Sequence, residues 1–162
     1  MANTSLVPVV GTIRNIQNMS QDCCSLLVQV ITPEETENFV ITPDTTVIDS
    51  LQLRQGMRVA AFYDPNAPVP LIFPPQYRAV LVTRLERGEN VMLSVFDENL
   101  VSGQNTLQLN PGKTTRITTV NGQRFLCTPG NQELLVYYST TTRSIPPQTT
   151  PRRIVVLCNE LI

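Results

Sequence analysis

The sequence contains no histidine and no tryptophan, and Lys113 is its only lysine. The absence of histidine removes the commonest general base, the commonest metal ligand and every catalytic triad that uses an imidazole. No G-x-S-x-G, G-x-G-x-x-G or P-loop spacing occurs either. A carboxylate pair is the chemistry that remains for an enzyme, and Asp64 is the one candidate. Because Asp-Pro-Asn is more typical of a turn, we expect no enzyme, no catalytic residue and no cofactor.

Charge is scarce as well, since charged residues make up 15% of the chain and the formal net charge is −1. Duplex nucleic acid is not expected as a partner, because phosphate binding needs a basic stripe. A weakly charged β surface is poorly protected against association of strand edges. The composition therefore favours a protein whose partner is itself, as a homo-oligomer or a filament.

Long apolar runs are missing. None approaches the roughly 20 residues that span a bilayer, so no membrane insertion is expected. The first residues show no basic segment followed by an apolar one, which predicts no signal peptide. A cytoplasmic location follows, unless a sporulating cell releases the chain at lysis and places it outside the cell or on the spore surface.

Thirteen prolines and short apolar runs punctuated by turn residues are what the chain does contain. No window shows the apolar period of a helix, so the fold class is all-β. The glutamates at 34, 35 and 37 fit a solvated acidic loop better than a cation site. The predicted strands cover residues 9–16, 24–31, 38–42, 46–48, 51–53, 57–63, 79–83, 91–96, 106–109, 115–120, 123–127, 134–138 and 154–159.

Two long loops repeat one pattern. Residues 64–77 and residues 139–151 each follow an aromatic strand end, carry Pro-Pro-Gln, and precede a branched aliphatic strand. This repetition predicts a duplicated β module, with a first half at 1–86 and a second half at 87–162. The strand order favours two tandem small antiparallel OB-like barrels, and the alternative is a single jelly-roll-like sandwich.

The first loop is also unusually apolar. Leu71-Ile72-Phe73 is too apolar to leave in water, so we expect it to be buried in its own barrel or in a neighbouring chain. Prolines would then only stiffen the loop while its aromatic residues close the barrel mouth. The residues that we single out for interaction with another chain or with a small ligand are Leu6, Val7, Val9, Phe62, Tyr63, Leu71, Ile72, Phe73, Tyr77 and Arg143.

The four cysteines show no C-x-x-C spacing, which makes a zinc site or a redox motif unexpected. Cys127 and Cys158 are expected to be small buried apolar residues. Cys23 and Cys24 are adjacent at a predicted hairpin tip, so at least one thiol should face away from the core. All four are candidates for cross-links between chains in an oxidising compartment.

Several strings of the sequence resemble a β module found in clostridial and bacillar proteins of the Firmicutes. They are the run from Gly56 to Asp64 with the loop that ends at Tyr77, the segments 99–102 and 105–110, and the run 142–151. The resemblance covers most of the chain from about Gly11 to Leu157. In such proteins the module often accompanies a repeat named after the copper amine oxidase N-terminal domain, and those chains look secreted or surface-bound. It implies a non-catalytic surface module and brings no metal or catalytic residues with it, although this chain lacks both the signal peptide and the neighbouring repeat.

Together these observations predict a non-catalytic structural protein that self-associates into a surface assembly or fibre with disulfide cross-links. The alternative is a module that binds an oligosaccharide or a peptide through the proline-rich loops and their aromatic residues.

Overall fold

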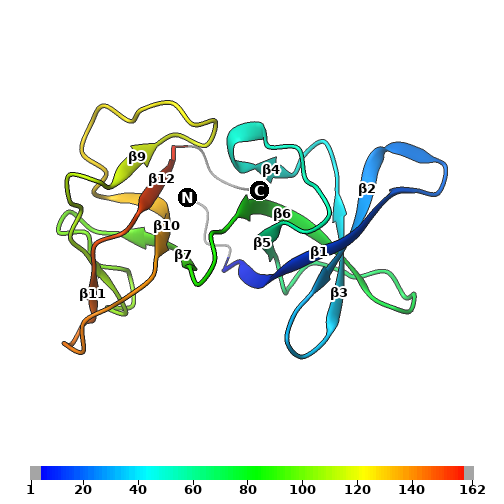
Figure 1. Ribbon diagram of the computed structural model, residues 1–162, viewed down its shortest axis with the longest axis horizontal. Helices are drawn as coiled ribbons and strands as arrows, with labels where there is room; N and C mark the ends of the chain where they lie inside the picture. The colour runs from blue at the N-terminus through cyan, green and yellow to red at the C-terminus, as the bar shows by residue number, and fades with distance from the viewer. Residues whose placement is uncertain (1–4, 159–162) are drawn as a thin grey trace. The chain divides into compact units, whose positions relative to one another are not determined.

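The computed structural model describes residues 5–158, and apart from one 3₁₀ turn, η1 (Ile48–Ser50), its regular structure there is β-strand (Figure 1). The predicted all-β barrel fold is confirmed. The chain divides between Arg84 and Leu85 into two compact units. This division lies two residues from the boundary expected from the sequence, and each unit is described by itself below.

The first unit is a closed five-stranded barrel. β1 pairs with β2 and β5, β2 with β3, β3 with β6, and β6 with β5, which completes the circle. All of these pairs are antiparallel except β3–β6, in which residues 38–40 run parallel to residues 76–78. This strand order is the OB-like order that the sequence predicted. The strands are β1 (Val7–Met19), β2 (Asp22–Ile31), β3 (Thr36–Ile41), β4 (Thr46–Val47), β5 (Arg58–Tyr63) and β6 (Gln76–Arg84), with β4 added in parallel to β6.

Alternate residues of these strands fill the barrel. Val28 and Val30 of β2, for example, are buried two positions apart, as a strand with one face on the core requires. Each such aliphatic side chain contributes about 1.5–3 kcal/mol by leaving water. The buried core consists of Ile13, Val28, Val30, Phe39, Ile41, Val59, Ala61, Ala79 and Val82.

Strand β1 serves two neighbours in succession. Residues 7–12 pair with β5 and residues 12–19 pair with β2, so the strand passes from one side of the barrel to the other near Gly11. A Cβ atom at Gly11 would overlap the carbonyl oxygen of Ile31 and would lie 2.8 Å from Cγ1 of Val30. Glycine is therefore required here by the close approach of a neighbouring backbone.

We expect Gly11→Ala to destabilise the first unit by about 3 kcal/mol or more, because the added methyl group meets backbone that cannot move aside. Gly103→Ala is the matched control, since its Cβ would find nothing nearer than the Val95 oxygen at 3.6 Å. Urea unfolding followed by tyrosine fluorescence compares the two. Equal midpoints would show that the barrel does not need the close approach.

The second unit repeats the first in reduced form. β10 pairs with β7 and β12 in antiparallel fashion, and β9 adds to β12 in parallel, as β4 adds to β6. Gln148 pairs in parallel with Gln108, as Gln76 pairs with Asn38. Single bridges from Phe96 to Ser102 and from Val101 to Gln108 complete the circle. The strands are β7 (Asn90–Phe96), β8 (Gln108–Leu109), β9 (Arg116–Thr118), β10 (Gln132–Tyr138), β11 (Gln148–Thr149) and β12 (Arg153–Leu157).

A separate core supports this second circle. It consists of Phe96, Leu107, Leu109, Leu134, Val136, Ile154 and Val156. The place of β2 is taken by Val101 and Ser102 alone, and β6 is represented by β11 and β12 with Pro151 between them. Proline cannot donate to a strand ladder, which explains why the strand is interrupted there.

Several expectations from the sequence are wrong. The jelly-roll-like alternative fails, because the strand pairs close circles instead of forming two stacked sheets. Residues 51–53 form no strand, although Leu53 packs against the first core. At residues 123–127 the Asn-Gly turn forms, with Gly122 N–H donating to the Thr119 oxygen at 3.1 Å, but only Arg124 bridges to β9. The last expected strand ends at Leu157, and its predicted end, Asn159, lies outside the described residues.

The N-terminal arm is also corrected. Val7 and Val9 were expected to be available to a neighbouring chain, but they pair with Tyr63 and Ala61 of β5 in their own barrel. Leu6 precedes them and is half-buried. Strand formation within the unit satisfies the backbone of the arm more directly than pairing between chains would.

Candidate functional site

The proline-rich loop of the first unit presents its apolar residues to solvent. Leu71 is 103% exposed and Phe73 is 94% exposed, while Ile72 and Val69 are about half-exposed. The expectation that Leu71-Ile72-Phe73 is buried in its own barrel is therefore wrong. The barrel is already filled by the side chains of its strands, so it has no room for the loop.

Local hydrogen bonds and prolines fix the shape of this loop. The Asp64 carboxylate accepts a hydrogen bond from the Asn66 N–H at 2.9 Å, and Ile72 N–H donates to the Pro70 oxygen at 2.9 Å. Asp64 thus caps a turn, and no second carboxylate contacts it among the interactions that the structure records. A loop that is stiffened in this way loses little further entropy when its tip meets a partner.

The second loop carries an exposed apolar residue at the equivalent place. Ile145 is 93% exposed and precedes Pro146-Pro147-Gln148, as Phe73 precedes Pro74-Pro75-Gln76. Both bonds before the first of these prolines are cis. Hydroxyl groups fix the second loop: Ser144 donates to the Pro146 oxygen at 2.9 Å, and Thr142 accepts from the Gln148 N–H at 3.0 Å. We call Leu71, Phe73 and Ile145 the loop-tip residues; Arg143 is exposed in the second loop.

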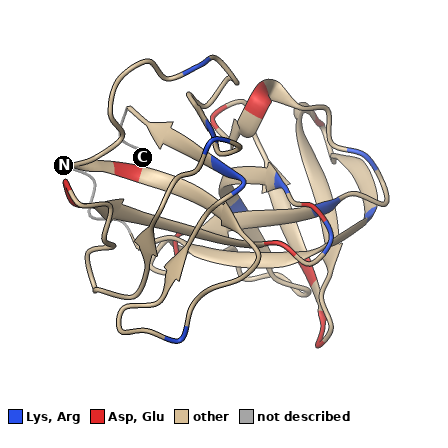
Figure 2. Cartoon of the chain, turned by 60° about the vertical axis from the view of Figure 1, so that its left-hand side comes forward, with Lys and Arg blue, Asp and Glu red and all other residues tan. Residues whose placement is uncertain are grey.

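Surroundings of low charge accompany these tips. Figure 2 shows that charged residues are thinly scattered along the strands and loops. Large apolar side chains that are almost fully exposed are uncommon and mark interaction sites more often than scattered half-exposed ones do. Leu126, 81% exposed, is the one other described residue of this kind besides the three loop-tip residues.

One end of the first barrel gathers three aromatic rings. The rings of Tyr63 and Tyr77 lie 4.8 Å apart between centroids, and each lies 6.2 Å from the ring of Phe39. Phe62 was expected among the interacting aromatics, but it is buried at 1% exposure. Only Tyr63 and Tyr77 of the predicted set therefore close this end of the barrel in the way the sequence suggested.

Two glutamates crowd the same end. Partial burial, the charge of Glu35 and a hydrogen bond with the Glu35 side chain all raise the pKa of Glu37, in decreasing order of effect. Burial raises the pKa of Tyr63 too, and Tyr77, Glu37 and Glu35 add to that rise. This end of the barrel is consequently an acidic and aromatic surface that disfavours further negative charge.

The raised pKa of Glu37 predicts how stability depends on pH. A carboxyl group whose pKa is higher in the folded state contributes stability at low pH and loses it as pH rises through that pKa. Glu37→Gln removes the penalty, so its melting temperature should exceed the parent's by about 1–2 °C at pH 7, a small value because water screens the group. The difference should vanish below about pH 4, where the carboxyl is protonated in either state.

Thermal melts at pH 7 and at pH 3.5 measure this effect. Glu34→Gln is the control, because Glu34 is an exposed carboxylate of the same loop. A gain that persists at pH 3.5 would mean that the glutamine acts through packing and that the charge of Glu37 is not the cause.

All four cysteines are exposed thiols. For Cys127 and Cys158 this overturns the expectation of burial, because Cys127 lies in an exposed loop beside Leu126, and Cys158 follows the last buried residue of β12. For Cys23 and Cys24 the expectation that at least one thiol faces outward is confirmed, and both do. The sequence could not distinguish these cases, since cysteine is at home in either environment.

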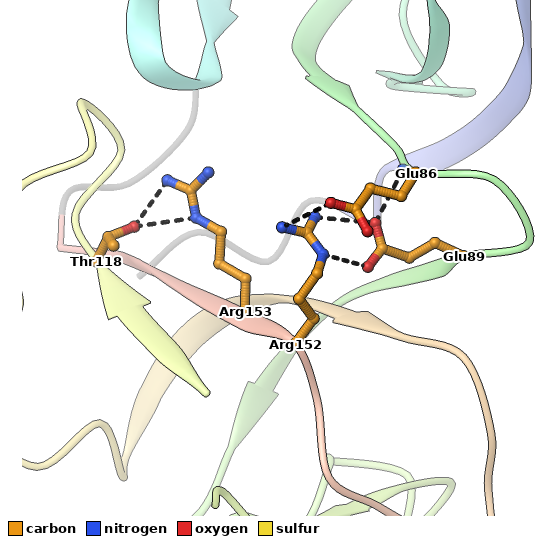
Figure 3. A network of polar contacts seen from close by, with 5 residues as sticks. All are labelled: Glu86, Glu89, Thr118, Arg152 and Arg153. Atoms are coloured by element: carbon orange, nitrogen blue, oxygen red, sulfur yellow. Dashed lines mark hydrogen bonds and ion pairs between the residues drawn. The ribbon is translucent and has the colours of Figure 1, made fainter. Parts of the chain in front are cut away.

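The polar network that organises the second unit was not found from the sequence. Arg152 donates from Nε to one oxygen of Glu89 at 2.6 Å and from Nη2 to the other at 2.9 Å (Figure 3). Only 2% of the Glu89 side chain is exposed, and its Oε1 also accepts from the Glu86 N–H at 3.0 Å. This two-fold contact is the strong geometry for an arginine and a carboxylate. It raises the pKa of Arg152, mainly through the hydrogen bond to Glu89, so the guanidinium stays charged.

Both arginines of this segment also contact an aromatic ring. The guanidinium carbons of Arg152 and Arg153 lie 5.3 and 5.8 Å from the ring centroid of Tyr137. Arg153 is buried and donates to the Thr118 hydroxyl from Nη2 at 2.8 Å (Figure 3). These contacts stabilise the junction of β10, β12 and β9, and nothing in them offers an open site for a ligand. The adjacent arginines at the start of an apolar strand were the one signal in the sequence.

We expect Arg152→Met to destabilise the second unit by about 2–3 kcal/mol, because Glu89 would lose its two charge-assisted hydrogen bonds while it remains buried. The value lies below that for a fully buried pair, since 34% of the Arg152 side chain is exposed. Arg124→Met, the same change at an exposed arginine of the same unit, should stay within about 0.5 kcal/mol of the parent. Urea unfolding measures both, and similar losses would assign the effect to arginine in general and not to the pair.

The described residues contain no cluster of three or more His, Cys, Asp and Glu side chains that could hold a metal ion. Within residues 5–158, no helix has the length and apolar character to cross a membrane. Comparison with known proteins gives no match to a protein family, to a curated protein or to a solved structure.

Proposed function

We propose that this protein is a non-catalytic structural subunit that self-associates through its loop-tip residues into a surface assembly or fibre. The observation that carries the proposal is the nearly complete exposure of Phe73 and Ile145, which stand immediately before Pro-Pro-Gln in both units. A core position that is merely tolerant would not place an apolar residue in water twice at the same point of a duplicated fold. Repetition of the feature supports a shared role.

The energy of such contacts favours repeated association over an isolated pair. Burying the three loop-tip side chains would contribute roughly 5–9 kcal/mol. Bringing two chains together costs about 4–15 kcal/mol in lost freedom of motion. One contact of this size is therefore marginal, whereas a subunit that makes several contacts at once gains from effective concentration.

A second copy of the chain is the occupant that fits the tips best. The formal net charge is −1 and charge is thinly spread, so no strong field selects a highly charged partner. Each copy carries two tips that differ in sequence, Leu71 with Phe73 in one and Ile145 in the other. Contacts between unlike surfaces are heterologous, and such contacts form open filaments unless the rotation closes a ring.

The proposed location is a cell or spore surface. It rests on the resemblance to surface modules of the Firmicutes, and release from a lysing sporulating cell would bring a chain without an export signal to that place. The resemblance adds no enzymatic role to the structural one.

Replacing the loop-tip residues tests the proposal. In Leu71→Ser/Phe73→Ser/Ile145→Ser the mean mass in solution should fall to that of the monomer, because the apolar area available for contact is lost. Leu126→Ser, the control, removes an equally exposed leucine outside both loops and should leave assembly unchanged. Sedimentation velocity with reductant present measures non-covalent association alone. A parent chain that stays monomeric up to its solubility limit would contradict the proposal.

A second candidate function is favoured by the acidic and aromatic end of the first barrel. The Tyr63 and Tyr77 rings, with Glu35 and Glu37 beside them, offer stacking surfaces and hydrogen-bond acceptors suited to an oligosaccharide or a peptide. Changes in the ring-proton shifts of these tyrosines on titration would support this candidate, which takes precedence if the parent chain is monomeric.

A further inference from the structure

The β1–β2 hairpin extends beyond the barrel as a two-stranded ribbon. β5 pairs with β1 only up to Thr12, and β3 pairs with β2 only from Leu26, so the outer parts of the hairpin pair with each other alone. Figure 1 shows this hairpin, in blue, reaching away from the other strands of its unit. Nearly every residue from 14 to 24 is exposed, with Ile16 and Met19 half-buried.

Cys23 and Cys24 lie in an irregular part of this ribbon. Asn18 is opposite Leu26 and Met19 is opposite Asp22, which leaves Cys23, Cys24 and Ser25 without cross-strand partners. Such a bulge re-aims the side chains that it carries. Ser25 is buried while both cysteines are exposed, and the Asp22 carboxylate fixes the tip by accepting from the Cys24 N–H at 3.0 Å.

The two thiols are poorly placed to bond to each other. Adjacent Cα atoms lie about 3.8 Å apart, whereas a relaxed disulfide needs about 4.4–6.8 Å. Cys127 and Cys158 belong to the other unit. Both thiols of the tip are therefore available to other chains at the same time.

We propose that the hairpin tip is a bivalent cross-linking site that forms disulfides with the tips of two other copies of this chain. The inference rests on the proposed self-association, which brings copies together. One thiol per tip could join copies only in pairs, whereas two thiols per tip allow a covalent chain to grow in both directions. The protruding ribbon keeps the bonds away from the barrel, so the fold itself does not depend on them.

The chemistry is thiol–disulfide exchange. A thiolate of one tip attacks a small disulfide oxidant, such as oxidised glutathione, and releases one small thiol. A thiolate of the second tip then attacks the mixed disulfide and releases the other small thiol. Two protein thiols lose two electrons and two protons in total, one S–S bond forms between the chains, and the oxidant is reduced to two thiols.

A background variant with Cys127→Ser and Cys158→Ser isolates the tip. After treatment with oxidised glutathione, it should show dimers, trimers and higher species on a non-reducing gel, and all should return to monomer with reductant. Adding Cys23→Ser or Cys24→Ser should limit each ladder to the dimer, and adding both should leave only monomer. Because all four side chains are exposed, these serines should leave the circular dichroism spectrum unchanged.

Two results would overturn the bivalent site. The background variant could stop at the dimer, or it could remain monomeric with a mass two daltons lower after oxidation, which would reveal a bond between Cys23 and Cys24. These failures are separable from failure of the proposed function. Association in the presence of reductant with no ladder removes the cross-linking site alone, and a ladder from a chain that does not associate under reductant removes the loop-tip contact alone.

Discussion

Each unit depends on one short parallel strand pair that closes its circle. In the first unit residues 76–78 of β6 leave β5 behind and pair with β3, and in the second Gln148 and Thr149 pair with β8. The strand that enters the circle must therefore begin well away from the end of the preceding antiparallel strand. A two-residue hairpin cannot span that separation, so a long loop is required in both units. The Pro-Pro-Gln sequence stands where each loop becomes a strand, and its glutamine is the first residue to pair in parallel.

This constraint also explains why the loop tips are outside. The circle is filled by side chains from its own strands, and a loop that connects two of its members runs over the surface. The second circle is smaller, because a turn and two bridging residues replace the long hairpin of the first. Its core is correspondingly reduced, and the contact between Arg152 and Glu89 reinforces the place where Pro151 interrupts the final strand. A buried ion pair is costly to desolvate, but its two parallel hydrogen bonds specify one arrangement of the chain ends that it joins.

Most of this fold could be predicted from the sequence because strands, turns and repeats are local features. Alternation of apolar residues located most strands, and the repeated Pro-Pro-Gln indicated the duplication. Contacts between distant residues could not be predicted. Gly11 reads as an ordinary strand residue until the backbone at Ile31 lies against it, and Glu89 reads as part of a charged turn until Arg152 arrives from 63 positions later. The candidate site was predicted only in its residues. Leu71 and Phe73 were rightly singled out, but a rule that apolar residues are buried says nothing of whether the same chain or another buries them.

The loop tips and the hairpin tip would divide the work of assembly between reversible and covalent contacts. Apolar tips make weak contacts that can form, dissociate and correct themselves, because each contributes little more than association costs. Disulfides form slowly by comparison and resist dissociation once made. A subunit with both can first find its register through the tips and then fix it through Cys23 and Cys24. The order matters, since bonds made before registration would trap irregular contacts. The separation of the two features within the first unit, with the thiols on a ribbon and the apolar residues on a proline-stiffened loop, lets each change state while the barrel between them stays the same.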